Sequence, residues 1–258
     1  MTPLISISDL IHESWNFFKN DWKTIVKRNA WLIPVMIAYF ALYMAGIATS
    51  RPVLILLGLL VLLVGSIFVT LHVSRYLLAK DGSAAQSTQS KSLMELFWPG
   101  LVISLVSGLG VLGGSILFLL PGIWFAIASG FALFVYLEEG VTGTSAIGRS
   151  MELVKGRWWS TLWRLFVPGL VFQLILGVIS FVVFIVPAIV AGIGGLGAMM
   201  SFSEGGSGAM GAASVPILII AGILFIVAIV INMLLSLVAA GLMQVVQVKL
   251  FHGLKASR

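Results

Sequence analysis

His72 and Arg75 form the first pair of side chains in this sequence whose types and spacing could do chemistry. They are three residues apart, so a helix places them one turn apart on the same side. An imidazole and a guanidinium in that arrangement could contact a lipid phosphate or a carboxylate. A lone histidine close to the end of an apolar segment is more often a plain interfacial residue, and both interpretations stay open at this point.

Carboxylates and histidines elsewhere do not form a catalytic pattern. Glu138 and Glu139 are adjacent, so on a helix they diverge by about 100° and cannot act as one acid–base pair without a partner. His12, His72 and His252 are isolated in the sequence, which is not the spacing of a metal site. We therefore predict no catalytic, cofactor-binding or metal-binding residues, and a protein that is not an enzyme.

Two further classes of site are disfavoured by residues that are missing from the sequence. Cysteine is absent, so there is no thiolate nucleophile, thiolate metal site or disulfide. The glycine-rich stretch between residues 192 and 211 contains no lysine, which a phosphate-binding loop of the GxxxxGK type requires. We expect no bound cofactor.

Composition places the chain in a membrane. Of its 258 residues, 60% are hydrophobic and 9% are charged, and the mean hydropathy is +1.13; a soluble domain is usually about 25% charged. The formal charge of +6 comes from basic residues at the ends of apolar runs, which is typical of an orientation signal and not of a nucleic-acid surface. We expect no nucleic-acid partner and no cleavable signal peptide.

Apolar runs of about 20 residues, enough to cross about 30 Å of hydrocarbon, set the expected architecture. The prediction is all-α: a polytopic transmembrane helical bundle of six spans forming a single membrane domain over residues 1–258. The spans are expected at residues 31–48, 53–78, 98–119, 122–137, 162–186 and 216–240. The glycine-rich residues 192–214 are predicted to be a mobile outer loop or a re-entrant segment. Pro187 predicts a break or kink. The apolar pattern of the last span continues to about Phe251, longer than a bilayer needs, so this helix is expected either to project into the cytoplasm or to bend at Gly241.

Basic residues predict the orientation. With both termini in the cytoplasm, every one of the 15 Lys and Arg residues except Arg51 falls on the inner side. The positive-inside rule then favours a multi-pass protein of the bacterial inner membrane with both ends cytoplasmic.

Two amphipathic helices are expected on the cytoplasmic side, at residues 6–29 and 144–156. In the first, Ser6 or Ser8 can cap the helix, and an apolar stripe is expected at Ile7, Ile11, Trp15, Phe18, Trp22 and Ile25. The second belongs to the stretch 138–164, the longest ordered-looking polar interruption between apolar blocks. Basic and tryptophan side chains of both regions are predicted to meet anionic lipid headgroups. These are Lys19, Lys23, Lys27, Arg28, Arg149, Lys155, Arg157, Trp158 and Trp159.

No acidic residue lies at the middle of a predicted span, where ion-coupled transporters and intramembrane enzymes generally need one. Gln173 and Asn232 are the mid-span amides. Hydrogen bonding between helices is the better interpretation of both, and lining a polar cavity is the alternative. Small residues repeat every four positions at Gly110 and Gly114, and from Gly122 to Gly130, where helices can approach closely.

A weak internal repeat aligns residues 14–22 with residues 150–158, sharing Ser, Lys and Trp at the same spacing. A proline follows each copy at the start of a span, Pro34 or Pro168. Together with a partial third copy near residue 92, this predicts three hairpins, each introduced by an amphipathic segment.

Three runs, residues 118–123, 138–140 and 146–159, resemble a bacterial membrane-domain superfamily. It includes the membrane domain of glycerophosphoryl diester phosphodiesterases and related six-span inner-membrane proteins. The residues that match its motif are Pro121, Gly122, Arg149, Ser150, Lys155 and Gly156. The likeness covers residues 118–164 and implies an integral membrane module. In the phosphodiesterases, a separate soluble barrel does the catalysis, and this chain has no residues left over for it, so no phosphodiesterase activity is expected.

Three functions follow from these features. The leading hypothesis is a non-enzymatic scaffold or membrane-homeostasis component that binds anionic lipids, with a protein partner or a second copy of the chain as further candidate partners. The second is movement of a lipid or small apolar solute, with Gln173 and Asn232 in a cavity. The third is a lipid-modifying enzyme at the inner interface using His72, Arg75 or Glu138.

Overall fold

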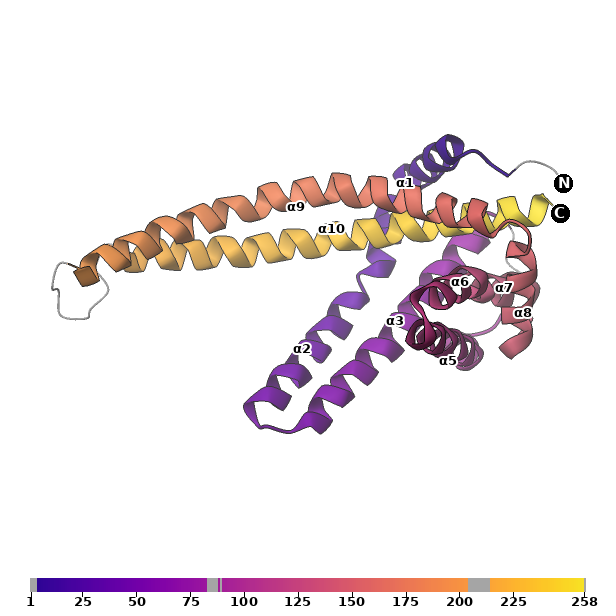
Figure 1. Cartoon of the computed structure of the whole chain (residues 1–258), viewed down its shortest axis with the longest axis horizontal. Coiled ribbons are helices and arrows are strands. Elements are labelled where there is room, and N and C mark those ends of the chain that lie inside the picture. The colour runs from indigo at the N-terminus through magenta and orange to yellow at the C-terminus, as the bar shows by residue number, and fades with distance from the viewer. Residues whose placement is uncertain (1–3, 83–87, 89, 204–213, 258) are drawn as a thin grey trace. The chain divides into compact units, whose positions relative to one another are not determined.

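The computed structural model describes residues 4–82, 88, 90–203 and 214–257, and these are almost entirely helical, with no strand among them (Figure 1). The predicted all-α class is therefore confirmed. The helices are α1 Ile7–Asn29, α2 Leu32–Ala48, α3 Pro52–Lys80, α5 Leu93–Leu117, α6 Leu119–Ser129, α7 Ala132–Glu139, α8 Gly143–Val154, α9 Trp158–Ser203 and α10 Ser214–Ala256.

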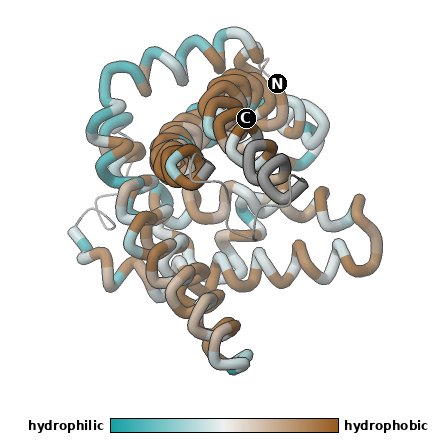
Figure 2. Tube along the Cα trace, turned by 90° about the vertical axis from the view of Figure 1, so that its left-hand side faces the viewer, coloured by the Kyte–Doolittle hydropathy of each residue, from teal (hydrophilic) through white to brown (hydrophobic). Residues whose placement is uncertain are grey.

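Within the described residues, 6 helical segments are long and apolar enough to cross a membrane. Figure 2 shows the same property along the trace, most of which is hydrophobic. The segments are Ile7–Ala48, Pro52–Lys80, Leu93–Leu117, Leu119–Glu139, Trp158–Leu196 and Val215–Ala256. The chain is a multi-pass helical membrane protein.

The chain divides into two compact units, and the single membrane domain stays a prediction. Unit 1 comprises Met1–Gly169 and Ala240–Arg258, and unit 2 comprises Leu170–Ala239. Because α9 and α10 each run through a unit boundary, the two helices contribute to both units.

Helix α1 is the amphipathic helix expected near the N-terminus. Ser6 caps it: its hydroxyl accepts from the Asp9 amide at 3.0 Å. The buried face is Leu10, Ser14, Phe18, Ile25 and Asn29, whereas Trp15 and Trp22 are 48% and 47% exposed. At both tryptophans the expected stripe therefore does not pack against the protein, and its placement on the lipid surface stays a prediction.

The packing partner of α1 explains which side of this helix is buried. A Cβ atom on Gly241 of α10 would lie 2.8 Å from Ile25 and 3.0 Å from Phe18, so the glycine lets the two helices approach closely. Asn29 adds a 3.5 Å hydrogen bond to Gln244. Gly241 thus serves a helix contact, and α10 continues through it as one helix.

Glycines also set the pairing of α5 with α6. A Cβ on Gly114 would lie 2.9 Å from the Gly122 amide nitrogen, and one on Gly110 would overlap the Phe125 ring. The small-residue faces predicted for these spans therefore meet within one chain. In the same way Gly65 of α3 accepts Val35 of α2, at 2.5 Å from the position a Cβ would take.

The inner end of α10 belongs to the core of unit 1. Phe251 is fully buried, and its ring lies 6.3 Å from that of Phe131 and 5.8 Å from that of Phe134. The apolar pattern that continues past residue 240 is explained by this core, since a membrane span alone would not need it.

Unit 2 is an antiparallel pair formed by parts of α9 and α10. The rings of Phe184 and Phe225 lie 5.5 Å apart, and a Cβ on Gly194 would lie 3.0 Å from Ile217 and Leu218. Residues 192–203 are helical, so the predicted loop was wrong there, and residues 204–213 lie outside the described part. Close packing at Gly194 offsets the weak helix propensity of glycine. Pro187 likewise lies inside α9 and does not end it.

Candidate functional site

A basic pocket forms where the C-terminal end of α1 meets the last turns of α3. We define it by Arg28, His72, Arg75 and Tyr76, with Ala79 and Leu93 completing a cavity of about 290 Å³. The Arg28 guanidinium carbon lies 4.4 Å from the centre of the Tyr76 ring, and its Nη1 lies 3.0 Å from His72 Nε2. Because a guanidinium only donates, Nε2 accepts and the His72 imidazole is neutral, with its proton on Nδ1.

One hydrogen-bond donor at the pocket is unpaired. Arg28 Nε is buried and has no hydrogen-bond partner among the described residues, although buried donors are usually paired. Two guanidinium groups around one hollow suit an anion with several oxygen atoms. His72 and Arg75, paired in the sequence, thus lie with Arg28, and the residues that line the pocket include no carboxylate.

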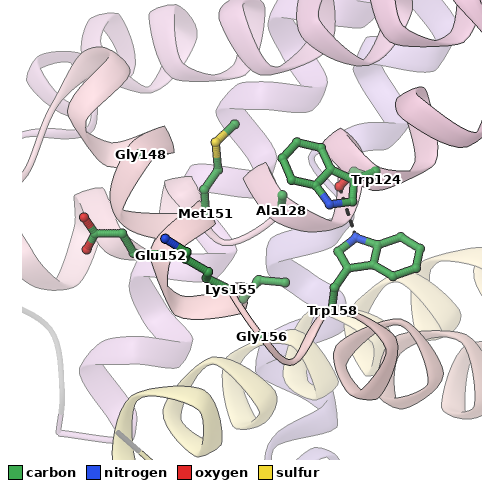
Figure 3. Close-up of a pocket in the computed structure, with 9 residues that line it drawn as sticks. Trp124, Ala128, Gly148, Met151, Glu152, Lys155, Gly156 and Trp158 are labelled. Carbon is green, nitrogen blue, oxygen red and sulfur yellow. Dashed lines mark hydrogen bonds between the residues drawn. The ribbon is translucent and has the colours of Figure 1, made fainter.

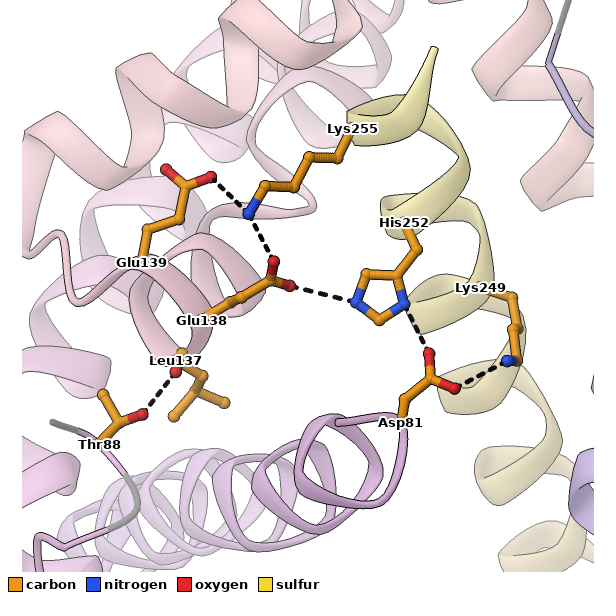
Figure 4. A network of polar contacts seen from close by, with 8 residues as sticks. All are labelled: Asp81, Thr88, Leu137, Glu138, Glu139, Lys249, His252 and Lys255. Carbon is orange, nitrogen blue, oxygen red and sulfur yellow. Dashed lines mark hydrogen bonds and ion pairs between the residues drawn. The ribbon is translucent and has the colours of Figure 1, made fainter. Parts of the chain in front are cut away.

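A second polar cluster, here called the tail network, comprises Asp81, Glu138, Glu139, Lys249, His252 and Lys255 (Figure 4). It joins the ends of α3, α7 and α10. His252 lies between two acids, with Nδ1 2.7 Å from Asp81 Oδ2 and Nε2 3.1 Å from Glu138 Oε2. Lys249 pairs with Asp81 at 3.0 Å, and Lys255 with Glu138 at 2.5 Å and Glu139 at 3.3 Å.

The tail network sets three carboxylates against Lys249, Lys255 and the His252 ring, and Arg149 adds a further cation at Glu139. Burial opposes ionisation of Asp81, but the hydrogen bond and charge of Lys249, together with His252, lower the pKa of that carboxyl below its usual value. The arrangement is a set of ion pairs that connects three helix ends.

Sequence reasoning missed the tail network because its members are far apart in the chain. His252 is isolated in the sequence, yet its side chain meets Glu138, 114 positions away. A signal was present in the spacing of Lys249, His252 and Lys255, which puts three basic side chains on one side of a helix.

Arg149 links α8 to the end of α7. Its Nε lies 3.2 Å from Glu139 and its Nη1 lies 3.1 Å from Glu152. Hydrogen bonds to Glu152 and Glu139 raise the pKa of this guanidinium. Arg149, predicted to face lipid, therefore has protein partners.

The other motif residues have structural positions. Ser150 is fully buried; its hydroxyl donates to the Ala128 carbonyl at 2.7 Å and accepts from the Phe131 amide at 3.1 Å. It thereby satisfies backbone groups at the break between α6 and α7. Gly122, after Pro121, allows the close contact with α5, and Gly156, after Lys155, has φ +78° in the turn into α9.

A hollow of about 390 Å³ lies beside α8, bordered by Trp124, Met151, Lys155 and Trp158 (Figure 3). The Trp158 indole donates to the Trp124 carbonyl at 3.2 Å, which fixes one wall. Lys155 is exposed at its edge. Its walls are mostly apolar, and only Glu152 and Lys155 bring charge.

The remaining predicted interface residues divide into exposed and engaged ones. Lys19, Lys23 and Lys27 are exposed, and Trp159 is 66% exposed. Arg157 instead donates to the Ser257 carbonyl at 2.8 Å. Nearby, Arg164 donates to the Ile5 carbonyl at 2.7 Å, so arginines fasten both terminal segments of unit 1.

Gln173 and Asn232 both belong to unit 2. Gln173 is exposed, and the Asn232 carbonyl accepts from Ser236 at 2.8 Å. Neither side chain lines the three cavities described in this molecule.

Among the described residues, no group of three or more His, Cys, Asp or Glu side chains is placed to hold a metal ion. The chain was also compared with known proteins. No family model, curated protein or solved structure matches it.

Proposed function

We propose that this protein is a non-enzymatic integral membrane protein, a scaffold or membrane-homeostasis component, whose basic cytoplasmic surface binds anionic lipid. The observation that carries the proposal is the outer side of α1. Lys19, Lys23 and Lys27 are all exposed there, one turn apart, and the half-exposed rings of Trp15 and Trp22 accompany them.

The opposite side of α1 fixes the direction of this surface. Phe18 and Ile25 are buried against Gly241 of α10, and this packing holds α1 with its lysines facing outward. Indole rings favour the headgroup level of a bilayer, and each basic residue close to an anionic surface contributes about 1 kcal/mol. Three lysines would therefore contribute about 3 kcal/mol at low salt.

Orientation and family complete the proposal. Arg28, Arg75 and Lys80 lie at one end of the α2–α3 hairpin and Arg51 at the other, which supports cytoplasmic termini in a bacterial inner membrane. Membership of the superfamily that its motif resembles is part of the same proposal. Buried Ser150 and the positive φ of Gly156 support it, because both give motif residues a structural reason.

The test is hydrogen exchange of residues 7–29, measured on the full chain in lipid nanodiscs. Protection of α1 should be greater with phosphatidylglycerol than with phosphatidylcholine. The triple variant Lys19→Gln, Lys23→Gln, Lys27→Gln should lose most of that difference. Arg51→Gln, which removes a charge at the other end of the α2–α3 hairpin, is the control and should retain it.

Equal protection of wild-type α1 in both lipids would contradict the proposal. So would a triple variant that keeps the full difference, because the lysines would then not be the groups that sense lipid charge.

A further inference from the structure

An apolar groove is lined by residues that neighbour those of the basic pocket along the same stretches of chain. It has a volume of about 490 Å³ and is lined by residues that include Trp31, Val35, Ala38, Val64, Phe68 and Met94. It belongs to α2, α3 and the start of α5 and lies wholly within unit 1; Figure 1 shows α2 and α3 as neighbouring helices.

On three stretches of chain, a residue that lines the pocket is close in sequence to one that lines the groove. Arg28 in the pocket is three residues from Trp31 in the groove, and His72 is one turn from Phe68. Leu93 in the pocket is next to Met94 in the groove. Lining residues of the charged hollow and of the apolar one therefore lie within about one helical turn, 5.4 Å, of each other along the chain.

From this geometry we infer a binding site for one anionic phospholipid, with its phosphate in the basic pocket and an acyl chain in the apolar groove. The inference rests on the proposed function, since it takes membrane lipid as the ligand, and it names a separate set of residues. Phosphate oxygens are the acceptors that a guanidinium fork binds best.

Each pocket residue has a role in this site. His72 and Tyr76, one turn apart on α3, hold the Arg28 guanidinium by a 3.0 Å hydrogen bond and a 4.4 Å cation–π contact. Arg28 lines the cavity and supplies the first positive charge, and its buried Nε has no hydrogen-bond partner among the described residues. Arg75 supplies the second positive charge at the same cavity. The nearby Lys80 is paired with Asp21, so it does not compete for the phosphate.

Size fits a headgroup and not a whole lipid. The pocket's volume of about 290 Å³ is at the lower limit of ligand pockets, which span roughly 300–1,000 Å³. The chain of the lipid needs separate room, which the groove supplies. Its lining is almost wholly apolar, and Trp31 and Met94 are 60% and 65% exposed at its edge, so in a bilayer it faces hydrocarbon.

The experiment is native mass spectrometry of the purified full chain titrated with phosphatidic acid, phosphatidylglycerol or phosphatidylcholine. Wild type should bind one phosphatidic acid or phosphatidylglycerol at least tenfold more tightly than phosphatidylcholine. Arg75→Gln and Arg28→Gln should each lower that affinity by about tenfold to a hundredfold, as expected for a charge-assisted hydrogen bond. Arg75→Lys, which keeps the charge without the fork, should fall between.

Ala38→Trp fills the groove and tests the acyl arm. It should weaken binding of phosphatidic acid at least tenfold and leave binding of inorganic phosphate unchanged. Arg51→Gln is the charge control: it lies at the other end of the α2–α3 hairpin from the pocket and should change affinity less than twofold. Loss in Arg51→Gln equal to that in Arg28→Gln would show a general effect of net charge and would overturn the site while leaving the proposed function standing.

Two other results would overturn the inference. If inorganic phosphate binds as tightly as phosphatidic acid and Ala38→Trp has no effect, the pocket takes a soluble phosphate. If all three lipids bind equally to wild type, there is no phosphate recognition, and this measurement needs no variant to fold.

Discussion

Ser150 shows how one side chain can organise a helix break inside a membrane protein. Helix α6 ends at Ser129 and α7 begins at Ala132, which leaves backbone groups that lipid cannot satisfy. The fully buried Ser150 hydroxyl satisfies one acceptor and one donor of this backbone, because it donates to the Ala128 carbonyl and accepts from the Phe131 amide. The motif serine is therefore explained by hydrogen bonding, and no chemistry on a substrate is required of it.

Gly156 and Gly148 provide a matched prediction at this scale. Neither would bring a new Cβ within 4 Å of another group, but Gly156 has φ +78° while Gly148 lies in helix α8. Gly156→Ala should destabilise the protein by about 1–2 kcal/mol, because the left-handed region is strained for alanine. Gly148→Ala should be neutral or stabilise by up to about 1 kcal/mol. Thermal unfolding in detergent, followed by circular dichroism, measures both, and equal effects would show that the turn is not constrained.

At the scale of elements, the tail network holds the ends of α3, α7 and α10 together by ion pairs at one edge of the phenylalanine core. Phe251 is packed among Phe131 and Phe134, and the next residue, His252, reaches Asp81 and Glu138. Apolar packing supplies most of the attachment of this helix end. The ion pairs add direction, since each carboxylate accepts from a particular donor.

Asp81 makes the tail network sensitive to acid. The pKa of Asp81 is lowered from its ordinary value of 3.8 in the folded protein, so its ionised form contributes stability above that value, and this contribution is lost as the pH falls through the folded pKa. Asp81→Asn should cost about 1–2 kcal/mol at pH 6 and reduce the loss of stability between pH 6 and pH 3. Exposed Glu13 supplies the control, Glu13→Gln, which should behave as wild type. Thermal unfolding at pH 6 and pH 3 measures this effect. If wild type and Asp81→Asn unfold at the same midpoint temperature at both pH values, Asp81 does not have this role.

The two amphipathic helices, α1 and α8, bury equivalent positions when the internal repeat is used to align them. The offset that aligns Ser14 with Ser150 pairs Leu10 with Ala146 and Phe18 with Val154, and all these positions are buried. The repeat remains a prediction, but the buried faces of α1 and α8 agree with it. Each helix leads into a helical pair, α2 with α3 and α9 with α10.

At the scale of the molecule, orientation in the membrane is the property most open to a direct test. The chain has no cysteine, so single substitutions can be labelled without background. Thr49→Cys, between α2 and α3, should react with a membrane-impermeant maleimide from outside intact cells. Lys155→Cys, exposed after α8, should react only in inside-out vesicles. Reversed labelling would overturn the proposed topology, and labelling of both in permeabilised membranes is the control.

The six spans could be predicted from the sequence because crossing a bilayer requires only a sufficient run of apolar residues, a local property. The same holds for the Ser6 cap of α1 and for the absence of acidic residues from the middle of the predicted spans. The secondary structure of residues 192–203 was predicted wrongly. Their glycines locally indicate a loop, whereas packing of Gly194 against Ile217 favours a helix.

Which side chains meet was decided only by tertiary structure. Arg28 and His72 are 44 positions apart, and neither periodicity nor charge counting joins them. The same is true of Asp81, Glu138 and His252. His72 and Arg75 were identified by spacing within one helix, but the basic pocket needs Arg28 from another helix, and the direction in which α1 turns its arginine depends on how Phe18 and Ile25 pack on Gly241. A sequence specifies which segments are apolar; which faces they present to each other follows from shape complementarity among all of them.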